Sequence, residues 1–164
     1  NFLNFDRIDI LDAHSDVAKR LIENSYVTQP EEQVRNLLFR LPCYPDAGAQ
    51  EKYEELYGHG VCGRKIRDPM TGNITSYDII GRVPVKGRDV VIIDDICDGG
   101  GTFIPLAKKL KEAGAKTVTL YVTHGIFSKG LEPLKEHIDY LTPFQIIGNY
   151  VTMQDIKQFN ERTR

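Results

Sequence analysis

The sequence predicts an α/β domain of three layers, in which helices cover a mainly parallel sheet. Short apolar segments alternate with helical stretches along the chain. Strands that alternate with helices favour parallel pairing through right-handed crossovers. Acids, glycines and histidines follow several of these apolar segments, and the carboxyl ends of parallel strands meet at one edge of a sheet. We therefore expect the binding site at that edge.

The first half of the predicted fold begins with a strand over Arg7–Leu11, followed by a helix that ends by Glu23. The next stretch, Gln29–Asn36, is polar and is expected to be a loop or a short helix. A strand over Leu37–Cys43 then leads through a proline-containing turn into a helix that runs to about Tyr57.

Two extended segments follow, Val61–Ile66 and Ser76–Val83. Between them, Asp68–Asn73 (DPMTGN) combines Pro, Gly and Asn, which indicates a loop. Further along, the β-branched segment Thr117–Val122 predicts a strand, and Thr152–Arg164 predicts a surface helix.

The most informative stretch is RDVVIIDDICDGGGT, residues 88–102. Its apolar run, Val90–Ile93, predicts a buried strand, and the chain from Phe103 predicts a helix that ends at Gly114. Between them stand acids, glycines and a threonine: Asp94, Asp95, Asp98, Gly99, Gly100, Gly101 and Thr102.

This strand-to-helix turn predicts a site for a sugar phosphate. Consecutive glycines allow several backbone N–H groups to turn inward, and the helix start adds partial positive charge, so the turn makes an anion cradle. The upstream acids repel phosphate; they accept hydrogen bonds from sugar hydroxyls or hold a divalent cation.

The same residues admit a purely structural interpretation, in which the glycines form a tight turn and an aspartate caps the helix. The density of acids and glycines after an apolar strand favours the binding interpretation. Two other phosphate motifs are excluded, because no G-K-[ST] follows and Ile104 stands where G-x-G-x-x-G requires its third glycine.

Composition excludes several classes of function. With 41% hydrophobic and 27% charged residues, residues 1–164 have the profile of one globular domain. A net charge of −2 argues against nucleic acid as the main partner. No apolar run approaches the roughly 20 residues of a membrane span.

The cysteines and the amino end give two further expectations. Cys43, Cys62 and Cys97 lack C-x-x-C spacing, which indicates reduced thiols in the cytoplasm; Cys97, inside the motif, is expected to be a small filler. Because the chain begins at Asn1, we expect its amino end to be a cut within a longer protein.

Further short groups fall at expected strand ends: D-A-H-S at 12–15, Y-P-D-A-G at 44–48, K-I-R at 65–67 and T-H-G at 123–125. Taken singly, each group is weak evidence for a binding site. The acids Asp12 and Asp46 can be caps, and Lys65 and Arg67 can be a solvated strand face.

Together these groups predict a phosphoryl-transfer site. Lys65 and Arg67, two apart on a strand, project to the same side just before the loop. Two cations on a movable loop suit a transferring phosphoryl group, whose oxygens accumulate charge. Asp12, His14 and Asp46 can hold Mg²⁺ or a nucleotide.

These motifs carry a family resemblance. Residues 91–102 are similar to the phosphoribosyl-diphosphate signature of the phosphoribosyltransferase superfamily. D-A-H-S-D, L-P-C-Y-P-D-A-G, G-R-K-I-R, I-I-G-R-V and V-T-H-G-I-F-S resemble segments of ribose-phosphate diphosphokinases in the same order, from about Ile8 to Ser128. The resemblance implies a phosphoribosyltransferase-type domain that forms the carboxyl-terminal part of a longer two-domain synthetase.

The resemblance also implies an activity: diphosphoryl transfer from Mg²⁺-bound ATP to the anomeric hydroxyl of ribose 5-phosphate, which gives the 1-diphosphate and AMP. Lys65 and Arg67 map onto the catalytic flexible-loop pair of that family, and Asp94, Asp95 and residues 98–102 onto its ribose 5-phosphate site. The metal and nucleotide region maps onto Asp12, His14 and Asp46. Family precedent implies a homo-oligomer.

Departures from the family pattern keep alternatives open. Gly99 stands where the family usually has a Thr or Ser that helps to hold the 5′-phosphate. The cradle is therefore roomier, and a 5′-substituted ribose such as ADP-ribose is a second candidate acceptor. Nearly all of the family's amino-terminal domain is missing, so this chain alone is not expected to hold ATP well.

Two other functions remain open. One is a phosphoribosyltransferase that acts on a nucleobase, and the other is a non-catalytic, synthetase-associated regulatory subunit. The intact pair Lys65 and Arg67 argues against the regulatory subunit, which has no need of them.

Overall fold

The computed structural model describes residues 4–72 and 74–163. Its strands are β1 (Ile8–Leu11), β2 (Ser25–Thr28), β3 (Leu41–Tyr44), β4 (Val61–Arg67), β5 (Ile74–Ile80), β6 (Asp89–Cys97), β7 (Thr117–Gly125) and β8 (Tyr140–Ile146). Its helices are α1 (Asp16–Leu21), α2 (Glu31–Arg35), α3 (Ala47–Tyr57), α4 (Phe103–Glu112) and α5 (Met153–Glu161), with a 3₁₀ turn, η1 (Glu132–Leu134).

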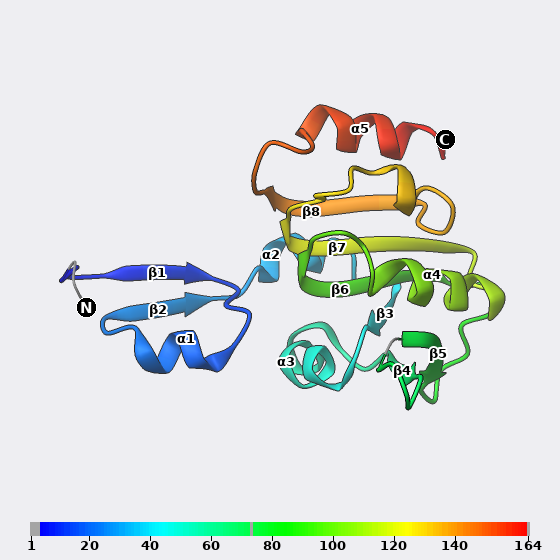
Figure 1. Ribbon diagram of the computed structural model, residues 1–164, viewed down its shortest axis with the longest axis horizontal. Coiled ribbons are helices and arrows are strands. Elements are labelled where there is room, and N and C mark those ends of the chain that lie inside the picture. Colours follow the sequence, from blue (N-terminus) through cyan, green and yellow to red (C-terminus); the bar gives the residue numbers. More distant parts are fainter. Residues whose placement is uncertain (1–3, 73, 164) are drawn as a thin grey trace.

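The centre of the fold is a six-stranded sheet with the strand order β5-β4-β3-β6-β7-β8 (Figure 1). β4 and β5 pair antiparallel, whereas the other neighbours in this sheet pair parallel. β6 lies between β3 and β7, so its carboxyl end lies near the middle of the edge that the strand ends form.

Successive side chains of β6 point to opposite faces of the sheet, and each set packs against helices on its own face. Val90 and Ile92 belong to a core cluster with residues of α4 and α5, and Val91 and Ile93 to a second cluster with residues of α3. All four side chains are fully buried. The predicted three-layer α/β architecture is confirmed.

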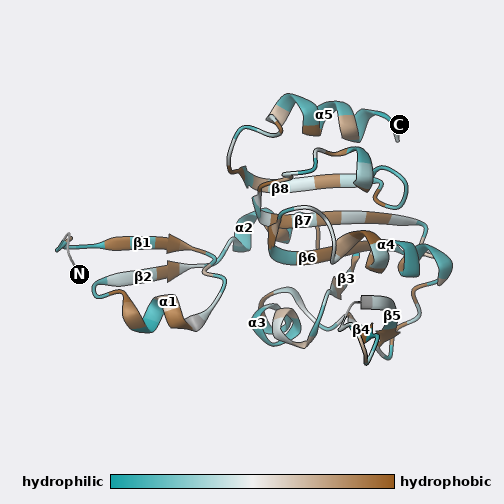
Figure 2. Ribbon diagram, in the orientation of Figure 1, coloured by the Kyte–Doolittle hydropathy of each residue, from teal (hydrophilic) through white to brown (hydrophobic). Residues whose placement is uncertain are grey.

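A small parallel unit, β1-α1-β2, stands apart from the main sheet (Figure 1). Figure 2 shows apolar residues along β1 and α1, and Leu21 and Tyr26 are 73% and 55% exposed. Two strands alone are marginally stable in water. The unit therefore depends on how residues 11–14, at the carboxyl end of β1, are attached to the main sheet.

Several boundaries differ from the sequence predictions. The predicted strand over Arg7–Leu11 forms, but it pairs with β2, a strand that the prediction lacked, as it also lacked β8. β6 pairs with β7 as far as Cys97, so Asp94 and Asp95 lie within the strand and not after it. Asn73 and Arg164, at the ends of the predicted loop and tail helix, lie outside the described residues.

Candidate active site

The glycine loop joins the carboxyl end of β6 to the start of α4. Gly100 has a φ of 78°, and its carbonyl accepts the N–H groups of Phe103 and Ile104 at 3.0 and 2.9 Å, which turns the loop tightly into the helix. A Cβ at Gly100 would come within 2.8 Å of the Leu134 side chain, whereas one at Gly101 would meet nothing within 4 Å. The loop is thus closed on one side and open on the other, as an anion cradle requires.

The two acids of β6 differ in their surroundings. Asp95 is 4% exposed and accepts hydrogen bonds from His14 and Lys52, whereas Asp94 accepts the backbone N–H of Asp95 at 2.9 Å. Burial, and next the charge of Asp95, raise the pKa of Asp94 to about 7. The charge state of Asp94 therefore changes near neutral pH and responds to a bound cation.

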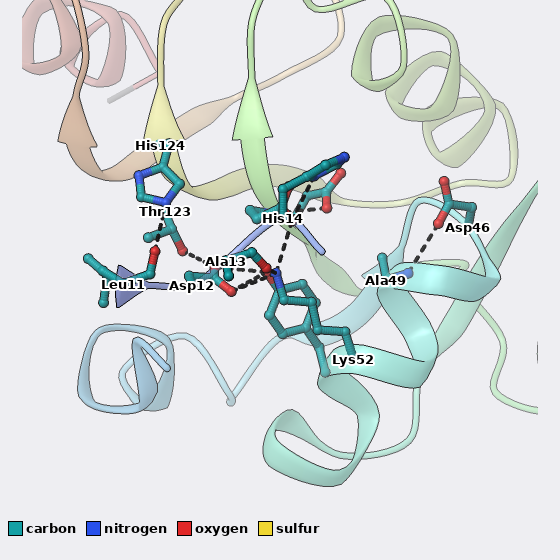
Figure 3. A network of polar contacts seen from close by, with 12 residues as sticks. Leu11, Asp12, Ala13, His14, Asp46, Ala49, Lys52, Thr123 and His124 are labelled. Atoms are coloured by element: carbon teal, nitrogen blue, oxygen red, sulfur yellow. Dashed lines mark hydrogen bonds and ion pairs between the residues drawn. The ribbon is translucent and has the colours of Figure 1, made fainter. Parts of the chain in front are cut away.

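Asp12 anchors the small β1-β2 unit to the main sheet (Figure 3). It is fully buried and has a φ of 48°, a left-handed conformation that is uncommon outside glycine. Its carboxylate accepts the Tyr53 hydroxyl at 2.8 Å and the Thr123 hydroxyl, and it pairs with Lys52 at 2.8 Å. These donors compensate the burial of the charge.

Lys52 of α3 connects this anchor to the acid pair. Its ammonium lies 2.8 Å from Asp12, 2.9 Å from Asp95 and 2.8 Å from the carbonyl of Ala13 (Figure 3). His14 approaches the same Asp95 carboxylate at 3.1 Å, with its own side chain 82% exposed. Segment 12–14 and the acids of β6 therefore share one polar network.

His124 supplies a further attachment from the end of β7. Its Nε2–H donates to the carbonyl of Leu11 at 3.0 Å, and its Nδ1 accepts the amide of Gln145 at 2.7 Å. The two bonds together hold the imidazole ring between the end of β1 and β8.

The predicted cation pair lies on the β4-β5 hairpin. Lys65 pairs with Asp46 at 2.7 Å, and Arg67 donates to the carbonyl of Gly72 at 3.0 Å. Arg64, one residue before Lys65, pairs instead with Asp78 of β5 at 2.6 Å. Asp46 also caps α3 by accepting the N–H of Ala49.

The predicted metal set is distributed over different contacts. Asp12, His14 and Asp46 lie apart from one another in Figure 3, with Asp46 at the start of α3. Asp12 pairs with Lys52, His14 contacts Asp95, and Asp46 pairs with Lys65. In residues 4–72 and 74–163, no group of three His, Cys, Asp or Glu side chains has an arrangement that holds a metal ion. Asp12, which is 0% exposed, has no oxygen open to an ion from solvent.

Lys52 and Tyr53 are site residues that no sequence motif predicts, and the motif that contains Thr123 and His124 predicts no role for them. A weak signal exists for Tyr53, because it shares an apolar helix face with Ala49 and Tyr57. Lys52 carried no such signal, since a lysine on a polar helix is usually solvated. The pairing of α3 with segment 12–14 is a tertiary property.

An acid pair and a glycine loop at the carboxyl end of a parallel strand are the arrangement that the resemblance to phosphoribosyltransferases implies. The chain belongs to the phosphoribosyl transferase domain family, whose model matches residues 69–156. It contains no helix, within the part of the chain that the structure describes, that is long and apolar enough to cross a membrane.

Curated relatives indicate which members of this family the chain is similar to in sequence. A ribose-phosphate pyrophosphokinase from Vibrio cholerae is 34% identical over 134 residues, which cover 75% of this chain and 42% of the relative. One from Thermococcus kodakarensis is 29% identical over 147 residues, or 84% of this chain and 52% of the relative. The resemblance to ribose-phosphate diphosphokinases is confirmed, and the chain spans about half the length, or less, of these relatives.

Solved structures support the same fold. The phosphoribosylpyrophosphate synthetase from Mycobacterium smegmatis superposes with a TM-score of 0.66 at 24% identity, over 84% of this chain and 48% of that one. The adenine phosphoribosyltransferase APRTase from Giardia lamblia gives a TM-score of 0.54 at 15% identity, over 73% and 78%.

The pKa of Asp94 predicts a pH-dependent stability. Because the folded pKa is about 7 and the ordinary value is 3.8, the folded state retains a proton that the unfolded state has lost, and stability falls as the pH rises from about 4 through 7. Asp94→Asn removes this loss. Its free energy of unfolding relative to the unaltered protein should rise by roughly 2 kcal/mol between pH 5 and pH 8 in urea titrations. Asp98→Asn, on the exposed loop, is the control, and an equal change in both variants would contradict the assignment.

Proposed function

We propose that the complete protein transfers the diphosphoryl group of ATP to the anomeric hydroxyl of ribose 5-phosphate, or of a 5′-substituted ribose such as ADP-ribose. The products are AMP and the 1-diphosphate. One observation carries this proposal: in a chain whose curated relatives are named ribose-phosphate pyrophosphokinase, the acid pair and glycine loop of β6 share a sheet edge with the Lys65 hairpin.

Each side of the site has a distinct task in this reaction. Asp94 and Asp95 accept hydrogen bonds from the ribose hydroxyls, while the backbone of residues 98–102 binds the 5′-phosphate. The anomeric oxygen forms a bond to the β-phosphorus of ATP as the bond from that phosphorus to the α–β bridging oxygen breaks. The hydroxyl proton is released, and AMP leaves with the bridging oxygen.

Lys65 and Arg67 stabilise the charge that accumulates on the transferring group. Lys65 contacts Asp46 in the described arrangement, so it must exchange a carboxylate for phosphate oxygens when the substrates bind. The hairpin that carries both cations lies at the edge of the sheet, where β5 has one neighbour among the described strands. Such a position permits this movement.

Magnesium, when bound, neutralises polyphosphate charge. Asp46 and His14 fit this task, since their side chains are 44% and 82% exposed and both lie at the edge that holds the acids. Mg²⁺ usually takes one or two carboxylates and retains several waters, so a cage of three protein ligands is not required. We extend the proposal to a cytoplasmic homo-oligomer, following family precedent.

AMP formation tests the proposal directly. The complete protein, given Mg²⁺, ATP and either ribose 5-phosphate or ADP-ribose, is expected to release AMP in a coupled or chromatographic assay. No AMP with either acceptor would overturn the proposal. Diphosphate release from phosphoribosyl diphosphate and a nucleobase would instead indicate a base-transferring enzyme.

Lys65→Ala is expected to lower kcat roughly 100- to 1,000-fold with a much smaller change in KM, because its charge acts mainly in the transition state. Arg64→Ala is the matched control, since Arg64 belongs to the same hairpin and pairs with Asp78. Steady-state kinetics with both substrates varied would check this. A rise in the acceptor KM without loss of kcat would contradict the role.

Gly99→Ser should restore the family's hydroxyl and lower the KM for ribose 5-phosphate about tenfold, which corresponds to roughly 1.4 kcal/mol for one added charge-assisted bond. The Lys129 side chain must shift by a few tenths of an ångström to admit it, because a Cβ at Gly99 would lie 3.2 Å from its Cδ and Cε. Gly99→Ala is the control that adds the carbon without the hydroxyl. Equal KM values for both variants would show that the hydroxyl is irrelevant.

A further inference from the structure

Lys52 is more buried and has more hydrogen-bond acceptors around its ammonium than a typical surface lysine. It lies on α3, its side chain is 22% exposed, and its ammonium contacts Asp12, Asp95 and the carbonyl of Ala13, all within 2.9 Å. An ammonium has three protons, and these three acceptors match them. The ring of Tyr53 lies 4.9 Å away and adds a cation–π contact.

The acceptors come from two parts of the chain that the sequence separates widely. Asp12 and Ala13 follow β1 in the small unit, whereas Asp95 belongs to β6 at the centre of the main sheet. His14, next along the first segment, contacts the same carboxylate of Asp95. One lysine therefore fixes segment 12–14 against the acid pair.

Lys52 is not needed merely to attach the segment. Asp12 is also held by the hydroxyls of Tyr53 and Thr123, and Leu11 is held by His124. The Asp12 N–H donates to the Thr28 carbonyl at 2.8 Å, which ties the segment to β2. None of these bonds, which come from Tyr53, Thr123, His124 and Thr28, involves Asp95.

Resting on the proposed function, we infer that Lys52 is a positioning residue for the reaction. It sets the orientation of Asp95, and with it the placement of the acid pair relative to His14 on the nucleotide side of the site. Lys52 touches no reacting atom in this role. It acts through the carboxylate that holds the ribose and through the segment that faces the donor.

Lys52→Gln tests this inference in the complete protein. The uncharged amide cannot bridge two carboxylates and a carbonyl, so kcat should fall roughly 10- to 100-fold and the KM for ribose 5-phosphate should rise, as for a small misplacement of reacting groups. Lys52→Arg retains the charge and should recover most of kcat. Lys109→Gln, a lysine of α4 paired with Glu112 at 3.5 Å, is the matched control.

Circular dichroism and thermal unfolding must first show that each variant is folded at the assay temperature, so that kcat refers to folded protein. If Lys52→Gln does not fold because Asp12 is left unpaired, the double variant Asp12→Asn, Lys52→Gln removes both charges, and the same fall in kcat is expected from it.

The outcomes separate the two proposals. AMP formation by the unaltered protein, with unchanged kcat and KM in the folded Gln variant or in the double variant, would overturn the role of Lys52 alone. Equal kcat in the Arg and Gln variants would also overturn it, because a structural filler needs no charge. No AMP from the unaltered protein with either acceptor would overturn the proposed function and this role with it.

Discussion

The buried carboxylate of Asp12 is the interaction on which the arrangement of the site depends. A fully buried charge with a left-handed backbone is costly, and it persists because Tyr53, Thr123 and Lys52 donate to it from two other elements. Through this one group, α3, β7 and the small β1-β2 unit are placed relative to one another. The exposed apolar residues of that unit gain no comparable contact elsewhere among the described residues.

Parallel pairing supplies the second constraint, because it brings separate strand ends to one edge. Asp95 of β6 and His124 of β7 are 29 positions apart in the numbering yet both contact segment 11–14. Asp46, at the end of β3, meets Lys65 of the hairpin at the same edge. The sheet thus assembles acids and cations that no local motif contains together.

Much of this fold was predictable, since β6 and α4 carry strong local patterns. β6 is apolar on both faces because it is central, and α4 presents Phe103, Leu106 and Leu110 at helical spacing. β8 was missed because Pro143 and polar residues interrupt an edge strand, and β2 because four residues hold too little pattern. The candidate site residues were proposed from the motifs and stay a prediction. Lys52 was not among them, since the contact between α3 and segment 12–14 exists only in three dimensions.

The asymmetry of the acid pair follows from these same contacts. Asp95 is oriented by Lys52 and His14, whereas burial and the neighbouring charge of Asp95 raise the pKa of Asp94 to about 7. Two adjacent carboxylates with equal surroundings would compete for one proton. Here the carboxylate of Asp95 is held by Lys52 and His14, whereas Asp94 accepts the backbone N–H of Asp95. Because its pKa is about 7, Asp94 exchanges a proton near neutral pH, so a cation that binds there displaces that proton and a sugar hydroxyl meets either form of the carboxyl group.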